Sequence, residues 1–516
     1  MIKKHIPLFI IFNLSFLISV AQFYNLPNEY SFNLLTQKQL AKKDSNIHSS
    51  IQPYIPFFSQ KYEHVADTHR IFKYITDDPA LDVMFIKHVV RIEPPNENFK
   101  LRLDPILNLE LGKDFADTIS RRLNNNTRGF IGSGSIGKNF YFETLFAENQ
   151  SQFPNYIFNN AKLTTVIPGQ GRWKAFKTNG FDYAFSSGFF SYQALKNLNI
   201  QVGHGKQKIG NGYRSLLLSD NAFNYPYARI TQQWFKGRVQ YSNIYAVFMN
   251  LVSANAILSP YAERLFQKKA ASFQYLSINA TKFLNISFFQ GLIWQAGDTK
   301  NKQHLSWEYF NPIIYTNLTR FGLNTKNNVL IGSDIKFKIT NKLNIYGQIM
   351  LDDLSNTNTI GNSWGYQTGL NYFDAFGVKN LFFQTEYNYV SESSYLGLGT
   401  NSTTILQPYS HYNQNIAFTP NYGQELVVIT DYKFKRFFTN IKYNYQAVPL
   451  NNNYYYTTSM LNAKVGYLIN PSYNLNVNIG VNYRVQNFNN FNNLNNQTNY
   501  VYFGFKTNLY NTYYDF

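Results

Sequence analysis

A glycine-rich, cationic segment between Gly203 and Pro226 holds the side chains with the clearest chemistry in the sequence. Four glycines within ten residues let the backbone turn sharply, and the regular alternation of polar and apolar residues fails there. Such a segment can fold inward as a constriction loop that presents ammonium and guanidinium donors to an anionic ligand. An equally good interpretation is a packed loop between strands in which arginine and aspartate neutralise each other. The candidate ligand-binding residues are Lys206, Lys208, Tyr213, Arg214, Asp220 and Asn221.

Two other residue patterns were compared with the spacing of known binding motifs, one for dinucleotides and one for metals. Neither pattern predicts a binding site here. Gly132, Gly134 and Gly137 match the GxGxxG spacing of a dinucleotide-binding turn. That turn needs a helix directly after it, whereas the residues that follow here have strand character, so the glycines predict a turn or a slim part of a wall. His64 and His69 are five residues apart, which is not a metal-ligand spacing on a helix face. We therefore expect neither a metal site nor a cofactor.

The composition excludes several classes of protein. The chain of 516 residues has no cysteine, which excludes a disulfide scaffold, a thiolate zinc site, an iron–sulfur cluster and a lipid-bearing N-terminal cysteine. Charged residues make up 15% and aromatic residues 18%, which argues against a solvated disordered chain. Lysine and arginine number 47 against 29 acidic residues, so an anionic lipid or glycan is an expected partner, while no motif indicates nucleic acid.

The first residues have the pattern of a secretory signal peptide. Lys3 and Lys4 form a positive n-region, residues 6–20 form a short apolar h-region, and Ala21 precedes the expected cleavage position. We predict a signal peptide over residues 1–21 and export to the cell envelope. No later segment approaches the ~18 consecutive apolar residues that a membrane helix requires. A membrane location of the mature chain therefore requires strands.

The rest of the sequence alternates with a period of two. Between Leu475 and Val485 the odd positions are apolar or aromatic, and the even positions are polar or glycine. The same pattern recurs over residues 101–111, 343–352 and 441–447. Most of these runs are long enough to cross a bilayer, and they are longer than the strands of a soluble sandwich. They predict an all-β fold, a transmembrane antiparallel β-barrel with about 18 strands between Phe99 and Tyr510.

The connections and the two ends of the chain have patterns of their own. Short turns such as Asn341-Lys342 alternate with long polar loops such as residues 393–424, which is the asymmetry of a bacterial outer-membrane barrel. We expect residues 22–98 to form a small periplasmic, helical or plug-like appendage and residues 99–516 to form the barrel. Phe516, at the end of the last strand, resembles the signal that barrel-assembly machinery recognises, so that machinery is an expected partner. The alternation slips after Leu509, which requires a bulge or a break in that strand.

The glycine-rich segment reads GHGKQKIGNGYRSLLLSDNAFNYPYARI, and shorter matches such as FNPII, NVLIGSD and GQIMLDD follow it along the chain. In these residues the sequence resembles the Wzi-type capsule-assembly outer-membrane barrels, and most closely their gliding-motility, RemB-like branch. The resemblance covers most of the chain from about Leu101. The residues that carry the long signature are Gly203, Gly210, Gly212, Ser215, Leu217, Ser219, Ala222 and Pro226.

The resemblance implies an eighteen-stranded outer-membrane barrel with a small helical part on the periplasmic side. Wzi-type members are lectin-like surface proteins that hold capsular polysaccharide, and the motility branch serves movement over surfaces. The partners that it implies are surface or capsular polysaccharide, lipopolysaccharide, outer-membrane lipids and the motility machinery. No catalytic residues are implied.

Three functions from different classes follow from these observations. The first is a polysaccharide-binding or motility-associated barrel that is not an enzyme. The second is a general diffusion porin, because eighteen strands can enclose a water-filled lumen. The third is a membrane hydrolase, although HExxH, P-loop and Ser-His-Asp spacings do not occur in the sequence.

Overall fold

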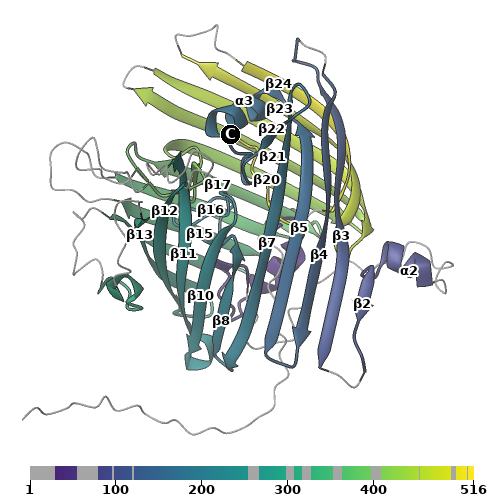
Figure 1. The fold of residues 1–516 in the computed structure, drawn as a ribbon. Coiled ribbons are helices and arrows are strands. Elements are labelled where there is room, and N and C mark those ends of the chain that lie inside the picture. The colour runs from purple at the N-terminus through teal and green to yellow at the C-terminus, as the bar shows by residue number, and fades with distance from the viewer. Residues whose placement is uncertain are drawn as a thin grey trace, which may run out of the picture.

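The computed structural model describes residues 29–54, 79–95, 98–118, 121–253, 266–297, 307–316, 327–352, 363–396, 408–451, 454–489, 496–507 and 509–516. The predicted signal peptide and the pair His64 and His69 lie outside the described residues. The long alternating runs form strands that pair in chain order and close into a ring (Figure 1).

Eighteen antiparallel strands form the wall of the barrel, which confirms the predicted fold class. The ring closes where β24 pairs with β3, with Tyr502 opposite Gly112. The wall strands are β3 (Phe99–Asp114), β4 (Leu123–Ile136), β5 (Phe140–Gln152), β7 (Gly180–Leu195), β8 (Leu198–Gly205), β10 (Tyr225–Trp234), β11 (Val239–Ser253), β12 (Phe266–Asn279), β13 (Leu284–Gly297), β14 (Asn328–Lys338), β15 (Leu343–Asp352), β16 (Ser363–Phe373), β17 (Leu381–Val390), β20 (Gly423–Phe434), β21 (Phe437–Asn451), β22 (Tyr454–Asn470), β23 (Leu475–Phe488) and β24 (Asn496–Thr507).

Shorter elements extend the wall or lie in the connections. β2 pairs with β3 and β6 pairs with β7. Among the described residues, no helix is long and apolar enough to span a membrane. The shorter elements are α1 (Leu34–Leu40), β1 (Ile51–Gln52), α2 (Pro79–Phe85), β2 (Val90–Ile92), α3 (Asn155–Thr164), β6 (Lys174–Phe176), β9 (Lys208–Ile209), β18 (Ser410–His411), β19 (Gln414–Asn415) and the 3₁₀ turns η2 (Phe235–Gly237), η3 (Trp307–Phe310) and η4 (Ala375–Gly377).

The apolar face of the wall points outward. On β23, Ile479 and Val481 are 54% and 39% exposed, whereas the inward Asn478 and Asn482 are 2% and 8% exposed. A soluble β protein buries its apolar face, so this inversion identifies hydrocarbon as the solvent of the outer surface. β15 repeats the pattern, since Ile349 is exposed and the residues beside it face the lumen. The alternation in the sequence thus correctly predicted both the strands and their facing.

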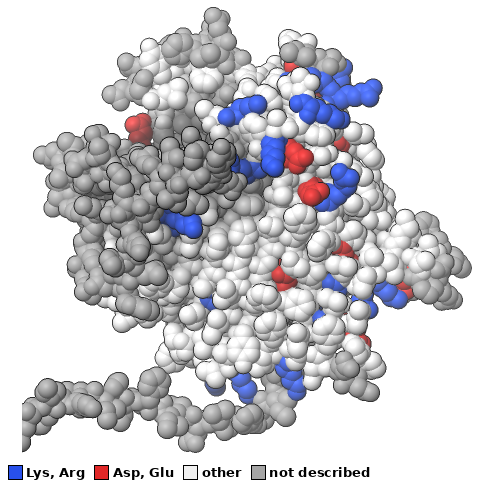
Figure 2. Space-filling view, viewed as in Figure 1, with Lys and Arg blue, Asp and Glu red and all other residues white. Residues whose placement is uncertain are grey.

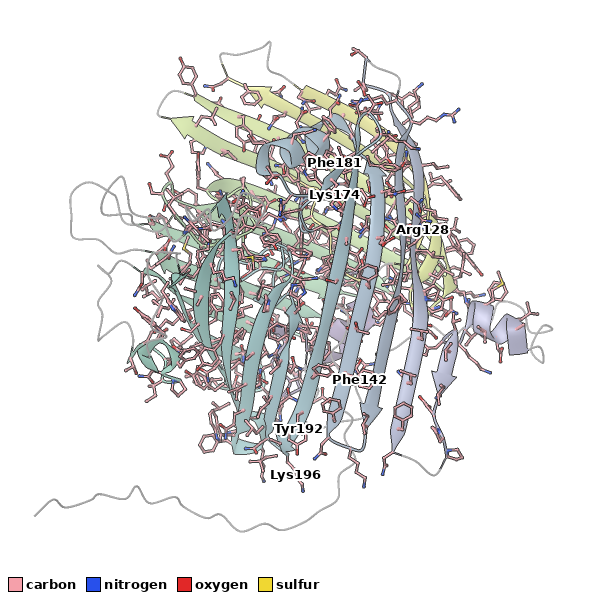
Figure 3. All side chains as sticks on the ribbon, viewed as in Figure 1. Arg128, Phe142, Lys174, Phe181, Tyr192 and Lys196 are labelled. Atoms are coloured by element: carbon pink, nitrogen blue, oxygen red, sulfur yellow. The ribbon has the colours of Figure 1, made fainter. Side chains whose placement is uncertain are left out.

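The two ends of the barrel differ in the length of their connections. Turns such as 137–139, 196–197 and 435–436 lie at the lower end in Figure 1, and long connections such as 206–224 leave the strands at the upper end. In outer-membrane barrels the short turns are periplasmic and the long loops extracellular, so the upper end is the extracellular one. Figure 3 places Tyr192 and Lys196 at the short-turn end and Lys174 and Phe181 at the long-loop end.

The predicted GxGxxG segment forms part of the wall. Gly132 and Gly134 lie on β4, and Gly137 has a φ of +64° in the turn that leads into β5. Strand β5 follows that turn, so no helix N-terminus is present there to hold a pyrophosphate. The three glycines therefore serve the turn and the wall, as the strand character of the following residues predicted.

The last strand corrects the prediction that Phe516 lies at the end of a wall strand. β24 ends at Thr507, and residues 509–516 turn into the lumen, where the C-terminal residue is seen within the ring of strands in Figure 1. There the backbone oxygen of Phe516 accepts a hydrogen bond from Arg484 Nε at 2.8 Å, and the ring contacts Tyr156. Polar side chains inside the barrel donate hydrogen bonds to the backbone of this segment. In lipid outside the wall the same backbone groups would have no hydrogen-bond partner. The slip in alternation after Leu509 marks this departure.

Candidate functional site

The glycine-rich segment leaves the wall and folds into the lumen. Gly203 lies on β8 opposite Tyr227, and Pro226 lies on β10 opposite His204. Residues 206–224 connect these strands through the barrel interior, and we call them the inward loop. The inward fold, one of the two interpretations of this segment, is therefore present. Gly210 has a φ of +144°, a backbone conformation that a residue with a Cβ rarely adopts.

Apolar residues anchor the inward loop. Leu216, Leu217 and Leu218 are fully buried and belong to one cluster with aromatic side chains of the wall such as Phe273 and Phe289. Burial of a leucine side chain stabilises by about 1.5–3 kcal/mol. The carbonyl of Leu217 also accepts a hydrogen bond from Tyr409 Oη at 2.6 Å, which ties the loop to the residues before β20. Leu217, a residue of the signature, and its two leucine neighbours thus hold the loop in place.

The serines of the signature also hold the inward loop in place. Ser215 Oγ accepts hydrogen bonds from the backbone N–H groups of Leu217 and Leu218 and donates to the carbonyl of Ile209. Ser219 N–H donates to Ile416 O at 2.6 Å. The signature residues Gly212, Ser215, Ser219 and Ala222 therefore shape and dock the inward loop.

Arg214 is the electrostatic centre of the inward loop. Its guanidinium donates to Glu425 through Nε at 2.9 Å and Nη2 at 2.7 Å, and Nη2 lies 3.3 Å from Asp515 Oδ1. Glu386 accepts hydrogen bonds from the backbone N–H groups of Tyr213, at 2.7 Å, and Arg214, at 3.0 Å. Two glutamates of the wall and one aspartate of the tail therefore hold this loop, and Arg214 does not pair with Asp220.

The tail carboxylate Asp515 has further donors around it. Tyr213 Oη donates to its Oδ2 at 2.7 Å, and Lys442 Nζ lies 2.9 Å from the same oxygen. Burial alone would raise the pKa of Asp515, but the charges of Arg214 and Lys442 and the Tyr213 hydrogen bond outweigh it and lower the pKa to about 2. The tail is therefore docked as a carboxylate.

Acidification is expected to weaken this docking. Because the docked pKa of Asp515 is about 2 and its ordinary value is 3.8, the carboxylate stabilises docking above about pH 3.8 and that contribution is lost as the pH falls toward 2. The thermal unfolding midpoint should drop over this interval, and Asp515→Asn should flatten the drop. Asp182→Asn at the extracellular end is the matched control. An unchanged pH profile in Asp515→Asn would contradict the assignment.

The remaining predicted ligand residues also contact protein groups. Lys206 Nζ donates to Gly169 O at 2.8 Å, and Lys208 Nζ donates to Tyr213 O at 2.9 Å. Asp220 accepts from Tyr513 Oη at 2.8 Å and from Asn511 Nδ2 at 2.9 Å, while Asn221 Nδ2 donates to Thr419 Oγ1 at 2.9 Å. Burial lowers the pKa of Lys206 to about 8 despite the opposing charge of Asp220. The loop is therefore packed, but its arginine and aspartate pair with other segments and do not neutralise each other. A ligand role for the six residues stays a prediction.

Residues 29–54 fill another part of the lumen. Ser31 Oγ donates to Asp431 at 2.9 Å, and Ser50 Oγ lies 2.6 Å from Tyr275 Oη. α1 packs against Phe373 and Phe382 near the short-turn end. β1 pairs with β9 of the inward loop through Ile51 and Ile209. Three segments that are far apart in the sequence, 29–54, 206–224 and 509–516, therefore occupy the interior together.

One serine–histidine contact bears on the hydrolase hypothesis. His48 Nδ1 lies 2.7 Å from Ser277 Oγ, and His48 Nε2 lies 2.9 Å from the carbonyl oxygen of Gly237. Burial lowers the pKa of His48 to about 4. The pair has a carbonyl where a triad has a carboxylate, and both residues are buried, so the contact fastens residues 29–54 to β12. Among the described residues, no three metal-ligating side chains cluster.

The extracellular end carries an exposed basic surface, which we call the extracellular rim. Figure 2 shows lysine and arginine side chains gathered at the upper end, over the tops of β3 and β4. Arg121 at this end is paired with Asp117 at 2.7 Å. The exposed cations of the rim form no ion pair with any carboxylate in the described part of the chain. They are Lys113, Arg122, Lys162, Arg172, Lys174 and Lys177.

Aromatic rings lie under several of these cations. Lys162 Nζ is 4.7 Å from the ring centroid of Trp173, which itself packs edge-on against Phe181 at 4.7 Å. Arg172 Cζ is 4.7 Å from the ring centroid of Phe266. Cation–π contacts hold a charged head near an apolar surface without neutralising it. The rim therefore offers positive charge and ring faces side by side.

The sequence contained signals for the residues that our prediction missed. Glu386 and Glu425 occupy polar, inward positions of alternating runs, and ionisable residues at such positions in a membrane protein usually have partners. The sequence did not show which loop these two glutamates would contact. Three of the rim lysines, Lys162, Lys174 and Lys177, fall in the connection between β5 and β7, which the alternation does not describe.

No protein-family model and no curated protein sequence matches the chain. Among solved structures, the chain is similar to Wzi, an outer-membrane protein involved in group 1 capsule assembly in Escherichia coli that is described as a carbohydrate-binding β-barrel, with a TM-score of 0.55 and 13% identity over 95% of this chain and 100% of that one. It is also similar to OccAB2 of Acinetobacter baumannii, with a TM-score of 0.45 and 11% identity over 79% of this chain and 97% of that one. OpdK of Pseudomonas aeruginosa has a TM-score of 0.44 and 9% identity over 78% of this chain and 98% of that one.

These identities establish a likeness of fold. The Wzi-like barrel that the glycine-rich segment predicted is confirmed at that level, while the capsule-assembly family and its motility branch stay predictions. With its closed ring, apolar outer face and unequal ends, the chain is an outer-membrane β-barrel with a Wzi-like fold.

Proposed function

We propose that this barrel is not an enzyme, that it binds acidic surface polysaccharide at its extracellular rim, and that it thereby serves capsule assembly or gliding motility. The observation that carries the proposal is the set of six exposed, unpaired cations beside aromatic rings at the long-loop end. Carboxylates or phosphates of a polysaccharide would meet the cations, and the apolar faces of its sugars would stack on the rings.

The filled lumen favours binding over general diffusion. A porin conducts through a water-filled interior, whereas here residues 29–54, 206–224 and 509–516 lie inside the wall. We expect negligible steady conductance when the purified protein is inserted into a planar bilayer. Large, stable open pores would instead favour the porin alternative.

Neutralising part of the rim should weaken retention on a polyuronate. We expect a variant with Lys162, Arg172, Lys174 and Lys177 each changed to Gln to bind immobilised polygalacturonate at least about tenfold more weakly, since each lost contact contributes a few tenths to one kcal/mol. Binding of the unchanged protein should weaken steeply with salt because the contacts are exposed charges.

The matched control removes cations at the opposite end. Lys196, Lys236 and Lys282 are exposed in the short turns, and changing all three to Gln should leave retention unchanged. Immobilised dextran, which is neutral, tests whether charge is required. Equal retention of both variants, or no retention of the unchanged protein on any acidic glycan, would count against the proposal.

A further inference from the structure

A cavity of about 260 Å³ lies inside the barrel between the tail and the wall formed by β3–β5 and β20–β24. We call it the lumen chamber. α3 contributes to its lining toward the extracellular end through Tyr156, and residues 29–31 contribute toward the periplasmic end. Its volume is near the lower end of the ~300–1,000 Å³ range of small-molecule sites. The residues of the rim do not line this chamber. The inference drawn from the chamber therefore does not depend on the function proposed for the rim.

The lining of the lumen chamber is composed mainly of amides and tyrosines. The amide side chains come from inward positions of several strands and remain partly accessible, although lipid lies on the other side of the wall. Amides donate and accept hydrogen bonds in pairs, which suits vicinal hydroxyl groups. The amides with accessible area are Asn108, Asn124, Asn125, Gln152, Asn440 and Asn462.

Two tyrosine rings lie flat against the chamber wall. A Cβ placed on Gly480 would meet the ring of Tyr502, and one placed on Gly112 would meet the ring of Tyr500. Because the glycine has no side chain, one face of the tyrosine ring can lie against the wall. The opposite face of the ring then points toward the lumen. The rings of Tyr500 and Tyr502 are nearly parallel, with an interplanar angle of 22° and centroids 5.5 Å apart. Such a surface fits the apolar face of a sugar ring.

The chamber also contains a cation without a hydrogen-bond partner. Lys442 lies 2.9 Å from Asp515 and Lys506 lies 3.4 Å from Glu110. Lys464 projects from β22 between them, and its ammonium donates to none of the described residues. Glu29 is the acidic group whose charge acts on Lys464 most strongly. A partly buried ammonium in this state favours an anionic group of a ligand within reach.

A second cavity, of about 70 Å³, lies beside the chamber, toward the short turns of the periplasmic end. Both cavities are lined by Glu29, Ser31, Lys464 and Lys506. The outer part of the second cavity is lined by cations in and beside the turn between β20 and β21, namely Lys433, Lys435 and Arg436. Positive charge at a mouth raises the local concentration of anions. The approach to the chamber is therefore basic, whereas its interior is rich in hydroxyl-binding groups.

We propose that the lumen chamber binds a short acidic saccharide that enters from the periplasmic end. Its carboxylate pairs with Lys464, its hydroxyl groups bond to the amides of β3, β4 and β22, and one sugar ring lies on Tyr502. The barrel thus has an interior saccharide site that is reached from the periplasm, in addition to the surface that faces outward.

Calorimetry on the full chain in detergent, with digalacturonate, maltose and inorganic phosphate as probes, tests the proposal. We expect saturable binding of digalacturonate, at least tenfold tighter than that of maltose or phosphate. Lys464→Gln should weaken digalacturonate binding by about tenfold or more. Gly480→Ala should displace the Tyr502 ring and weaken it several-fold, while leaving any phosphate binding unchanged. Lys435→Glu should slow association.

The controls separate this site from the extracellular rim. The rim variant with four Gln substitutions should bind digalacturonate as the unchanged protein does, and the heat-dependent gel mobility of each variant reports whether its barrel is folded. No saturable binding by a protein that is still retained on polygalacturonate would overturn the chamber and leave the rim proposal intact. Equal binding of phosphate and digalacturonate, or no effect of Gly480→Ala, would overturn the assignment to a saccharide.

Discussion

Arg214→Ala is expected to destabilise the docked inward loop by about 3–5 kcal/mol, because it leaves two buried carboxylates without their shared partner. Glu425 loses three contacts from the guanidinium, and Asp515 keeps only Lys442 and Tyr213. Both carboxylates are nearly inaccessible to water, so solvation cannot replace the lost contacts. Glu425→Gln should cost less, since Arg214 would retain Asp515.

Hydrogen exchange of residues 206–224 and of the tail measures this effect directly. In Arg214→Ala the exchange of both segments should accelerate, while the wall strands stay protected. Release of the loop should also raise bilayer conductance above that of the unchanged protein. Arg122→Ala, at an exposed position of the rim, is the control and should change neither quantity. Unaltered exchange in Arg214→Ala would show that the leucine cluster alone docks the loop.

Val481→Arg is expected to cost about 2–4 kcal/mol, the penalty for a cation on the lipid face near the bilayer midplane. Val481 lies in the middle of β23 and faces outward, opposite Val501 of β24. The guanidinium would enter hydrocarbon that has no donor or acceptor for it.

Urea unfolding of the barrel from lipid vesicles gives the cost of the substitution. Val485→Arg, on the same face but closer to the extracellular end of β23, should cost only about 0–1 kcal/mol because the side chain reaches the headgroups. Equal penalties at the two positions would mean that the outer face of β23 does not lie across the bilayer. This would contradict the outward orientation of its apolar residues.

The rim lies at the extracellular end of the filled barrel, and the lumen chamber lies in its interior. The rim presents cations over rings to the outside, and the chamber presents amides and tyrosines behind a basic periplasmic mouth. Beside the chamber, the inward loop and the tail meet at Arg214 and Asp515. Loss of that contact would therefore alter the chamber lining, which includes Tyr213 and the tail.

The alternation in the sequence determined the strands and their facing. A period of two puts every second side chain on the same face, so polar and apolar residues alone decide which face meets lipid. The run from Leu475 to Val485 shows this, since its apolar residues point outward in the structure. The four glycines between Gly203 and Gly212 indicated a sharp turn of the backbone, because their backbone freedom is a local property, and an inward fold was one of the two interpretations that this allowed.

Only the tertiary structure decided what the inward loop contacts. Arg214 meets Glu425 across 211 residues and the tail backbone across 301 residues, and the nearby Asp220 binds Tyr513 instead. Alternation places many polar side chains inside the barrel with the same local pattern, so it cannot select which of them a loop reaches. That choice follows from the closure of the ring, which sets the three-dimensional positions of the inward residues. The same closure brings β3 beside β24 and so creates the lumen chamber from residues at both ends of the barrel sequence.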